Sequence, residues 1–76
     1  MLFGRERGRY NQRQIEALSH PVRLRIWSLF TDDPDRPLTV GALHADLTKE
    51  DEFRDVTVSQ VNYHLARLKE AQLLPA

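Results

Sequence analysis

Residues 57–74 constrain the fold of this chain more than any other stretch, because they combine a helix start signal with an apolar stripe. Thr57 is a residue type that caps helices, since its hydroxyl can accept a hydrogen bond from a free backbone N–H of the first turn. Gln60 follows three residues later and can bond back to the cap, which makes a T-x-x-Q capping box. The stripe recurs at spacings of four and three, through Val61, Leu65 and Leu68. The pattern predicts a helix over residues 57–70 that docks on a core.

The other face of that helix is polar and aromatic. Its side chains are Ser59, Asn62, Tyr63 and Arg67, with Val58 at the front. Asn, Ser, Tyr and Arg are residue types that read base edges or hold phosphates in DNA complexes. The face therefore favours a helix that offers its first turns to the DNA major groove. An ordinary amphipathic surface helix has the same pattern, so this segment alone leaves both interpretations open.

A second, shorter helix is predicted over residues 38–47. Thr39 is its expected cap, and its apolar stripe consists of Val40, Leu43 and Leu47. A short amphipathic helix, a connection and a capped helix with a polar front make up the helix-turn-helix arrangement. In that arrangement the first helix lies across the DNA backbone, and the second enters the groove by its N-terminal turns.

Two further helices are expected upstream. Residues 17–30 are apolar on too many faces for a surface helix, which predicts a central helix buried on most sides. Pro21 suits its first turn, where the missing N–H of proline costs nothing. A weaker helix is expected from about Tyr10 to Leu18, with Ile15 and Leu18 facing inward.

These elements predict a mainly α fold, a winged-helix-like helix-turn-helix domain of about four helices with at most a minimal β element. A short strand is expected to pair around Leu38 and near residues 73–74. The chain should divide into a flexible basic arm, residues 1–13, and a helix-turn-helix DNA-binding domain, residues 14–76. The arm can lie along phosphates or enter a minor groove, or it can be a solvating tail. Its basic residues are Arg5, Arg7, Arg9 and Arg13.

Composition and spacing exclude several classes of function. There is no cysteine among the 76 residues, so there is no disulfide framework and no thiolate metal site. The three histidines lack the i, i+4 spacing of a helical zinc pair, and the aspartates of residues 32–35 lack the Gly and Glu of a calcium loop. Neither Ser19 nor Ser59 has a base and an acid arranged around it for nucleophilic catalysis. We therefore expect no enzyme activity, no metal and no cofactor, and we expect His64 to be partly buried and to bond a neighbouring carbonyl.

The hydrophobic runs are short. None approaches the ~18 residues of a membrane-spanning helix, and residues 1–10 lack the hydrophobic core of a signal peptide. The expectation is a cytoplasmic protein that does not enter a membrane.

The net charge is zero, but the charges are unevenly distributed. Residues 1–30 hold six Arg against two Glu, whereas residues 31–55 hold eight acids against three bases. A dipolar chain of this kind can still bind phosphates with its basic portion. The acidic part includes the connection at residues 48–55, which is longer than a typical helix-turn-helix turn. We expect Phe53 to anchor this connection, which is either a solvated loop or a surface that restricts DNA docking or contacts a protein partner.

Two stretches resemble a known family. The sequence A-L-S-H-P-V-R-L-R-I-W-S-L-F, at residues 17–30, resembles the opening of ArsR-type winged-helix transcriptional regulators. The sequence V-T-V-S-Q-V-N-Y-H-L-A-R-L-K-E-A-Q-L-L, at residues 56–74, resembles their recognition helix and the approach to the first wing strand. The resemblance implies a DNA-binding repressor or activator. It carries DNA contact over to Ser59, Asn62 and Tyr63, with Thr57 and Gln60 near the backbone.

The sequence departs from that family pattern after residue 70. The family places a wing hairpin after the position of Leu74 and a long dimerisation helix after the wing, and the sequence ends at Ala76 without either. A natural short protein and a fragment are both compatible with this truncation. Gln72 stands where the family usually has Gly, which serves a left-handed helix cap at no steric cost. Gln72 must adopt that geometry with strain or end the helix differently.

The leading hypothesis is a DNA-binding transcriptional regulator that inserts helix 57–70 into the major groove of double-stranded DNA. The residues expected to contact DNA are Thr57, Ser59, Gln60, Asn62, Tyr63 and Arg67. Arg23 and Arg25 are further candidates for phosphate contact, and Arg23 has a structural role as its alternative.

The competing hypothesis is a protein–protein interaction module on a wingless helix-turn-helix scaffold, binding another regulator or the transcription machinery. Such a module should expose an apolar patch on the recognition face. A homodimer is a further expectation, because domains of this kind bind paired half-sites. Its contacts would be Tyr10, Ile15 and Leu18.

Overall fold

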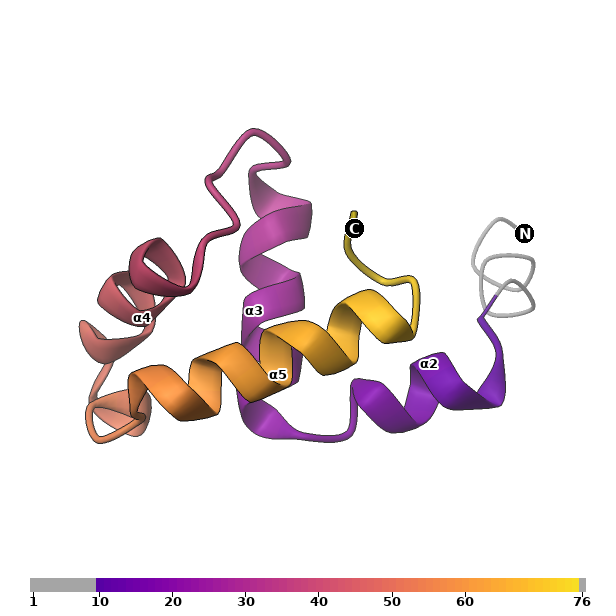
Figure 1. Ribbon diagram of the computed structural model, residues 1–76, viewed down its shortest axis with the longest axis horizontal. Coiled ribbons are helices and arrows are strands. Elements are labelled where there is room, and N and C mark those ends of the chain that lie inside the picture. Colours follow the sequence, from indigo (N-terminus) through magenta and orange to yellow (C-terminus); the bar gives the residue numbers. More distant parts are fainter. Residues whose placement is uncertain (1–9, 76) are drawn as a thin grey trace.

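The computed structural model describes residues 10–75, which form four α-helices and one 3₁₀ helix (Figure 1). The α-helices are α2 (Gln12–Ala17), α3 (Pro21–Asp32), α4 (Val40–Thr48) and α5 (Val58–Glu70), and η1 (Asp51–Phe53) lies between α4 and α5. The predicted mainly α, helix-turn-helix fold is confirmed. None of the helices in the described part of the chain is both long and apolar enough to cross a membrane.

The helix starts at α4 and α5 are those predicted from the capping residues. The Thr57 hydroxyl accepts a hydrogen bond from the backbone N–H of Gln60 at 3.1 Å, and the Gln60 side-chain oxygen accepts one from the Thr57 N–H at 2.9 Å. This is the predicted capping box. Thr39 caps α4 by accepting from the Ala42 N–H at 3.2 Å.

The other two α-helices also have side-chain caps, and His20, which precedes Pro21, is the helix-entry residue that its position predicts. Asn11 and Gln14 form a second capping box at the start of α2, with the Asn11 side chain accepting from the Gln14 N–H at 2.8 Å. His20 caps α3 through its Nδ1, which accepts from the Val22 N–H at 3.2 Å. The N-x-x-Q spacing of Asn11 and Gln14 could have predicted the cap of α2, whereas histidine is not among the preferred capping residues.

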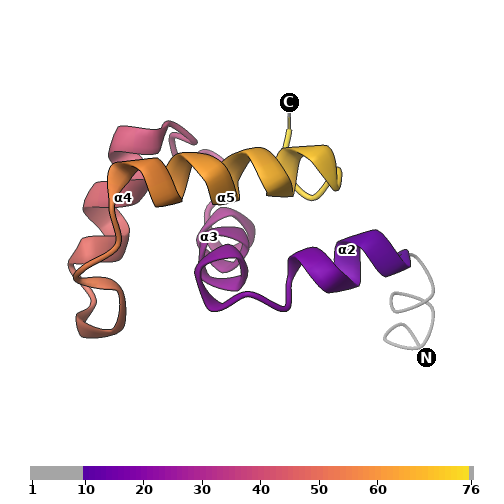
Figure 2. The same cartoon turned by 60° about the horizontal axis from the view of Figure 1, so that its bottom comes forward.

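The core forms where α5 crosses α3, as Figures 1 and 2 show from two directions. Helix α5 packs against each of the other three α-helices. The buried stripes are Val22, Ile26 and Leu29 of α3, Leu43 and Leu47 of α4, and Val61, Leu65 and Leu68 of α5. Burial of these side chains, at about 1.5–3 kcal/mol each, fixes which face of α5 is turned to solvent.

The predicted burial of the first two helices was partly wrong. Ile15 was expected to face inward, but 52% of it is exposed, and Ala17 is the buried residue of α2. The Gln14 amide donates to the carbonyl of Ala71 at 2.9 Å, which turns the face of α2 bearing Gln14 and Ala17 towards the end of α5. Helix α3 is not buried on most sides either, since 48% of Leu24 is exposed.

Gln72 ends α5 in the left-handed conformation, with φ 61°. The Leu73 N–H donates to the Leu68 carbonyl and the Gln72 N–H to the Lys69 carbonyl, each at 3.0 Å. This pair of bonds is a Schellman motif, whose central position usually belongs to glycine. Of the two alternatives that the sequence left open, Gln72 takes the strained one.

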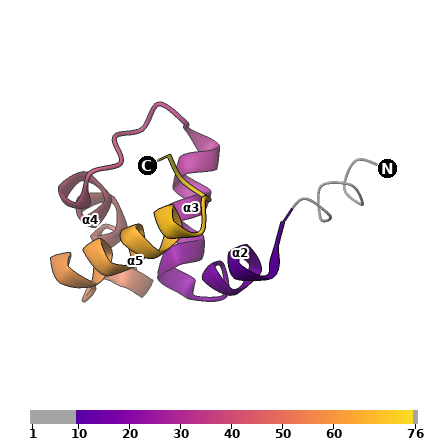
Figure 3. The ribbon, with the colours of Figure 1, turned by 45° about the vertical axis from the view of Figure 1, so that its right-hand side comes forward.

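The segment after α5 turns back towards α3 (Figures 1 and 3). Leu73 and Leu74 are both buried there, at 8% and 5% exposure. The strand expected at these residues and around Leu38 is absent from residues 10–75. Consecutive residues of a strand point to opposite faces, so two adjacent leucines that both enter the core do not form the expected edge.

Part of the predicted N-terminal arm lies outside the described residues. Arg5, Arg7 and Arg9 fall in that part, while Arg13 lies on α2, which begins at Gln12.

Candidate nucleic-acid interface

The side chains predicted to contact DNA lie together on α5 or at its cap. Thr57, Ser59, Gln60, Asn62, Tyr63 and Arg67 are all exposed. The buried stripe of α5 occupies the opposite side of the helix, so these residues share the solvent-facing side. Tyr63 is the aromatic residue among them, with 58% of the residue exposed.

Three of these residues keep all their hydrogen-bonding groups available. Ser59, Asn62 and Tyr63 make no side-chain hydrogen bond to any other residue in the 10–75 range. The Asn62 amide offers two donors and one acceptor, and the hydroxyls of Ser59 and Tyr63 each offer a donor and acceptor. A ligand that lies against this face can therefore use these groups without breaking a contact of the fold.

Thr57 and Gln60 are instead committed to the capping box. The Gln60 side-chain oxygen is occupied by the Thr57 N–H, and the Thr57 hydroxyl is occupied as an acceptor. Each still has donor hydrogens, on the Gln60 amide nitrogen and the Thr57 hydroxyl. Donors at a helix N-terminus suit an anion such as a backbone phosphate.

Arg67 lies two turns further along α5 and pairs with Glu70, their nearest atoms 3.1 Å apart. Both side chains are at least half exposed. An exposed pair of this spacing is held weakly, so Arg67 can leave Glu70 for another anion at little cost.

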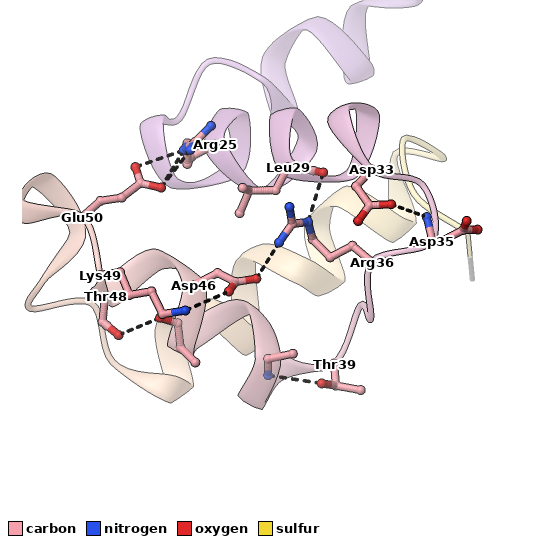
Figure 4. Close-up of polar contacts among 12 residues, drawn as sticks. Arg25, Leu29, Asp33, Asp35, Arg36, Thr39, Asp46, Thr48, Lys49 and Glu50 are labelled. Atoms are coloured by element: carbon pink, nitrogen blue, oxygen red, sulfur yellow. Dashed lines mark hydrogen bonds and ion pairs between the residues drawn. The ribbon is translucent and has the colours of Figure 1, made fainter.

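The two other arginines considered for phosphate contact have different surroundings. The Nε of Arg25 donates to both carboxylate oxygens of Glu50 at 3.0 Å (Figure 4). The Arg25 guanidinium also donates to the Ser28 hydroxyl at 3.2 Å. The bond to Glu50 raises the pKa of Arg25. Arg25 thus fastens α3 to the acidic connection. Arg23 is partly buried, and its Nε has no partner in the described part of the chain.

The connection between α4 and α5 contains η1 and is anchored on the core by Phe53, which is 6% exposed. The predicted anchoring role of Phe53 is confirmed. Two carboxylates of this segment are paired: Glu50 with Arg25, and Asp51 with Arg54 at 2.7 Å. The remaining acids, Glu52 and Asp55, are exposed.

His64 is buried beneath Tyr63, and its ring does not bond a carbonyl as predicted. Its Nδ1 is buried without a partner among the described residues, and the ring stacks on that of His20, the centroids 4.2 Å apart. The Tyr63 ring meets His64 edge-on at 5.2 Å. The histidine that bonds a carbonyl is His44, whose Nε2 lies 3.0 Å from the Val56 oxygen.

Burial lowers the pKa of His64 to about 4, with smaller effects from the nearby His20 and Arg23. His64 is therefore neutral at pH 7 and adds no charge beneath the exposed face of α5. Across residues 10–75, no three His, Asp or Glu side chains are grouped to hold a metal ion.

Comparison with known proteins gives one match. A family model described as a helix-turn-helix domain matches residues 18–74, which is most of the chain. Neither the curated proteins nor the solved structures contain a match. The matched residues span α3, α4, η1 and α5 and include the whole exposed face of α5.

Proposed function

Since the chain belongs to the helix-turn-helix domain family, we propose that it is a DNA-binding transcriptional regulator of the ArsR type that inserts α5 into the major groove of double-stranded DNA. An α-helix fits the width of that groove, where each base pair presents its own pattern of donors and acceptors. Helix α4 would lie across the backbone at the edge of the groove.

The observation that carries the proposal is the uncommitted polar face of α5. Asn62 has the side-chain geometry for a bidentate contact to adenine, and Ser59 can donate to or accept from either type of base pair. Tyr63 presents an exposed ring and hydroxyl one residue later, supported from below by His64. The buried stripe of α5 holds these side chains on a rigid element.

Contacts to the DNA backbone would come from the two ends of this face. Thr57 and Gln60 offer donors at the helix start, where the helix dipole favours negative charge. Arg67 offers a guanidinium two turns later. Such contacts set the position of the helix in the groove, while the contacts to bases select the sequence.

A protein–protein interaction module is the second candidate, and the exposed apolar surface of α5 is the observation that favours it. Val58 and Tyr63 expose 53% and 58% of their surface on α5, and the net charge of the chain is zero. The exposed side chains between them, Ser59, Gln60 and Asn62, are polar, so Val58 and Tyr63 do not form the continuous apolar patch that a partner helix would require. The acidic residues Glu52 and Asp55 would be the alternative contact surface.

Dimer formation is part of the proposal. Tyr10 and Ile15 are exposed by 37% and 52%, and the Tyr10 ring packs edge-on against Trp27 at 6.3 Å. A two-fold pairing through this region would bring two α5 helices into one assembly, and domains of this kind bind half-sites one helical turn apart, about 34 Å.

Salt dependence separates the two candidate functions. Binding to a duplex through phosphates weakens steeply as the salt concentration rises, because condensed counterions are released. We therefore expect the logarithm of the association constant to fall linearly with the logarithm of salt concentration in a fluorescence anisotropy titration. Absence of duplex binding at low salt would favour the protein–protein module.

A further inference from the structure

A charged cleft lies beside α5, on the side away from η1. Arg13 of α2, Arg23 of α3 and Arg67 of α5 line it, and its volume is about 600 Å³. Three arginines that are far apart in the sequence thus converge on one space. From the sequence, Arg13 is predicted to be part of an arm, and Arg23 and Arg67 to be phosphate contacts, because nothing in their spacing predicts that the three meet.

The arginines of this cleft are only lightly held by the fold. Arg13 makes no ion pair or side-chain hydrogen bond within residues 10–75, and Arg67 has only its exposed pairing with Glu70. Arg23 has a buried Nε–H without an acceptor in the same part of the chain. A buried donor left unsatisfied is costly, and Arg23 also lines the cleft. Guanidinium groups are well suited to carboxylate and phosphate, which they can bind with two parallel hydrogen bonds.

Two carboxylates also line the cleft, Glu16 of α2 and Glu70 of α5. They would repel the continuous negative charge of a nucleic acid strand. They would instead attract an ammonium group or accept hydrogen bonds from hydroxyls. The floor contains Ala17 and Ala71, both buried and small, which leaves room for an organic ligand.

From this arrangement we propose that the cleft binds a small organic anion, a phosphate monoester or carboxylate that also carries an ammonium or hydroxyl group. Arg13, Arg23 and Arg67 would hold the anionic end, and Glu16 and Glu70 the donor end. This inference does not depend on DNA binding, because no residue of the cleft other than Arg67 belongs to the proposed DNA-contacting face.

The cleft adjoins the face of α5 that would meet DNA. Arg23 is close enough to His64 for its charge to help lower the pKa of that histidine, and Tyr63 rests on His64. An anion on Arg23 would partly offset this charge and raise the pKa of His64. The pKa of His64 is thus a second readout of binding at the cleft.

The test is an NMR titration of the protein, without DNA, with phosphoethanolamine and with inorganic phosphate at constant ionic strength. The signals of the arginine Nε–H groups and the pKa of His64 are followed. We expect saturable shifts of the Arg13 and Arg23 signals, with phosphoethanolamine binding more tightly than inorganic phosphate.

Arg13→Gln should weaken binding about fivefold, the effect of losing roughly 1 kcal/mol of charge interaction. Glu16→Gln should reduce the preference for phosphoethanolamine and leave phosphate binding unchanged.

Arg54→Gln is the matched control, because Arg54 is an exposed arginine on the connection before α5, outside the cleft. It should bind both ligands as the unmodified protein does. The proposal is wrong if neither ligand gives a saturable shift, or if Arg13→Gln and Arg54→Gln weaken binding equally. It is also wrong if the cleft arginines respond to duplex DNA but to neither small anion, in which case they belong to the DNA interface.

Discussion

The imidazole ring of His64 on α5 lies against that of His20, the N-cap of α3, with ring centroids 4.2 Å apart and ring planes inclined by 36°. This contact joins the start of the central helix to the middle of the helix that carries the candidate DNA-binding face. The Nδ1 of His20 is occupied by the Val22 N–H, and the Nδ1 of His64 is buried without a partner among the described residues. A proton on His64 would therefore be placed in a desolvated site beside a second histidine.

The first prediction concerns acid sensitivity. The pKa of His64 is lowered to about 4 in the folded protein, whereas an unfolded histidine titrates near 6.5. Between these pH values the unfolded chain binds a proton that the folded chain does not, so the free energy of unfolding falls as the pH falls from about 6.5 to about 4. The loss from this one group is at most about 3.4 kcal/mol, since each pKa unit corresponds to about 1.4 kcal/mol.

Urea unfolding at several pH values between 7 and 4 measures this effect. His64→Leu fills the same buried position without titrating, so its stability should vary less across the window. An identical pH dependence of the two proteins would contradict the assignment to His64.

The second prediction concerns the helix end at Gln72. Its φ of 61° is unfavourable for any residue with a Cβ, at a cost of about 1 kcal/mol. Gln72→Gly should therefore raise the free energy of unfolding by up to that amount, as measured by urea denaturation. Ala71→Gly is the control, since Ala71 has φ −82° and gains no such relief. A destabilised Gln72→Gly protein would show that the Gln72 side chain contributes more than its backbone conformation costs.

The third prediction concerns the junction of α3 and α4. Arg36 donates from its Nε to the Leu29 carbonyl at 3.2 Å and pairs with Asp46 at 2.8 Å, as Figure 4 shows. Arg36→Ala leaves the Leu29 carbonyl with only the Asp33 N–H, at 3.1 Å, and leaves Asp46 with only Lys49, at 3.9 Å. The loss of the two Arg36 contacts should cost about 1 kcal/mol of stability. Arg54→Ala removes a pair with Asp51 that is far more exposed and should cost less than about 0.5 kcal/mol. Thermal unfolding of the two variants compares them directly, and equal losses would mean that the Arg36 pair adds nothing beyond surface charge.

The fourth prediction concerns the candidate DNA-contacting face. Asn62→Ala combined with Tyr63→Ala removes two exposed side chains and no hydrogen bond of the described fold, so circular dichroism and unfolding should change little. Discrimination between DNA sequences should be lost, because each good base contact is worth about 1–3 kcal/mol. Thr31→Ala, at the far end of α3, is the control, because Thr31 is exposed and its replacement leaves the net charge unchanged, and it should bind as the unmodified protein does. Unchanged sequence preference in the Asn62 and Tyr63 variant would remove these residues from the interface.

The sequence predicted the elements whose signals are local. The hydroxyl of Thr57, the amide of Gln60 and the stripe led by Val61 act within one or two helical turns, so α5 was found with its cap and its buried face. The same holds for Thr39 and α4. The positions proposed to contact DNA were found in the same way, since a helix with one buried face must expose the other.

The features that depend on packing between helices were missed or misjudged. Ile15 resembles a core residue in the sequence, but the bond from Gln14 to Ala71 turns it to solvent. The stack of His20 on His64 joins residues 44 positions apart, and no local pattern reports such a contact. Arg13 and Arg23 likewise come close to the end of α5 only because the helices pack together, so no local pattern predicts their shared cleft.

The most direct test of DNA recognition by α5 is selection of binding sites from a random-sequence duplex pool at low and moderate salt, with sedimentation of the free protein in parallel. If α5 reads the DNA sequence, we expect enrichment of a defined motif, palindromic if the protein sediments as a dimer, and loss of the enrichment when Asn62 and Tyr63 are replaced by alanine. If the protein binds all sequences of the pool equally, or binds none of them, α5 does not recognise a DNA sequence.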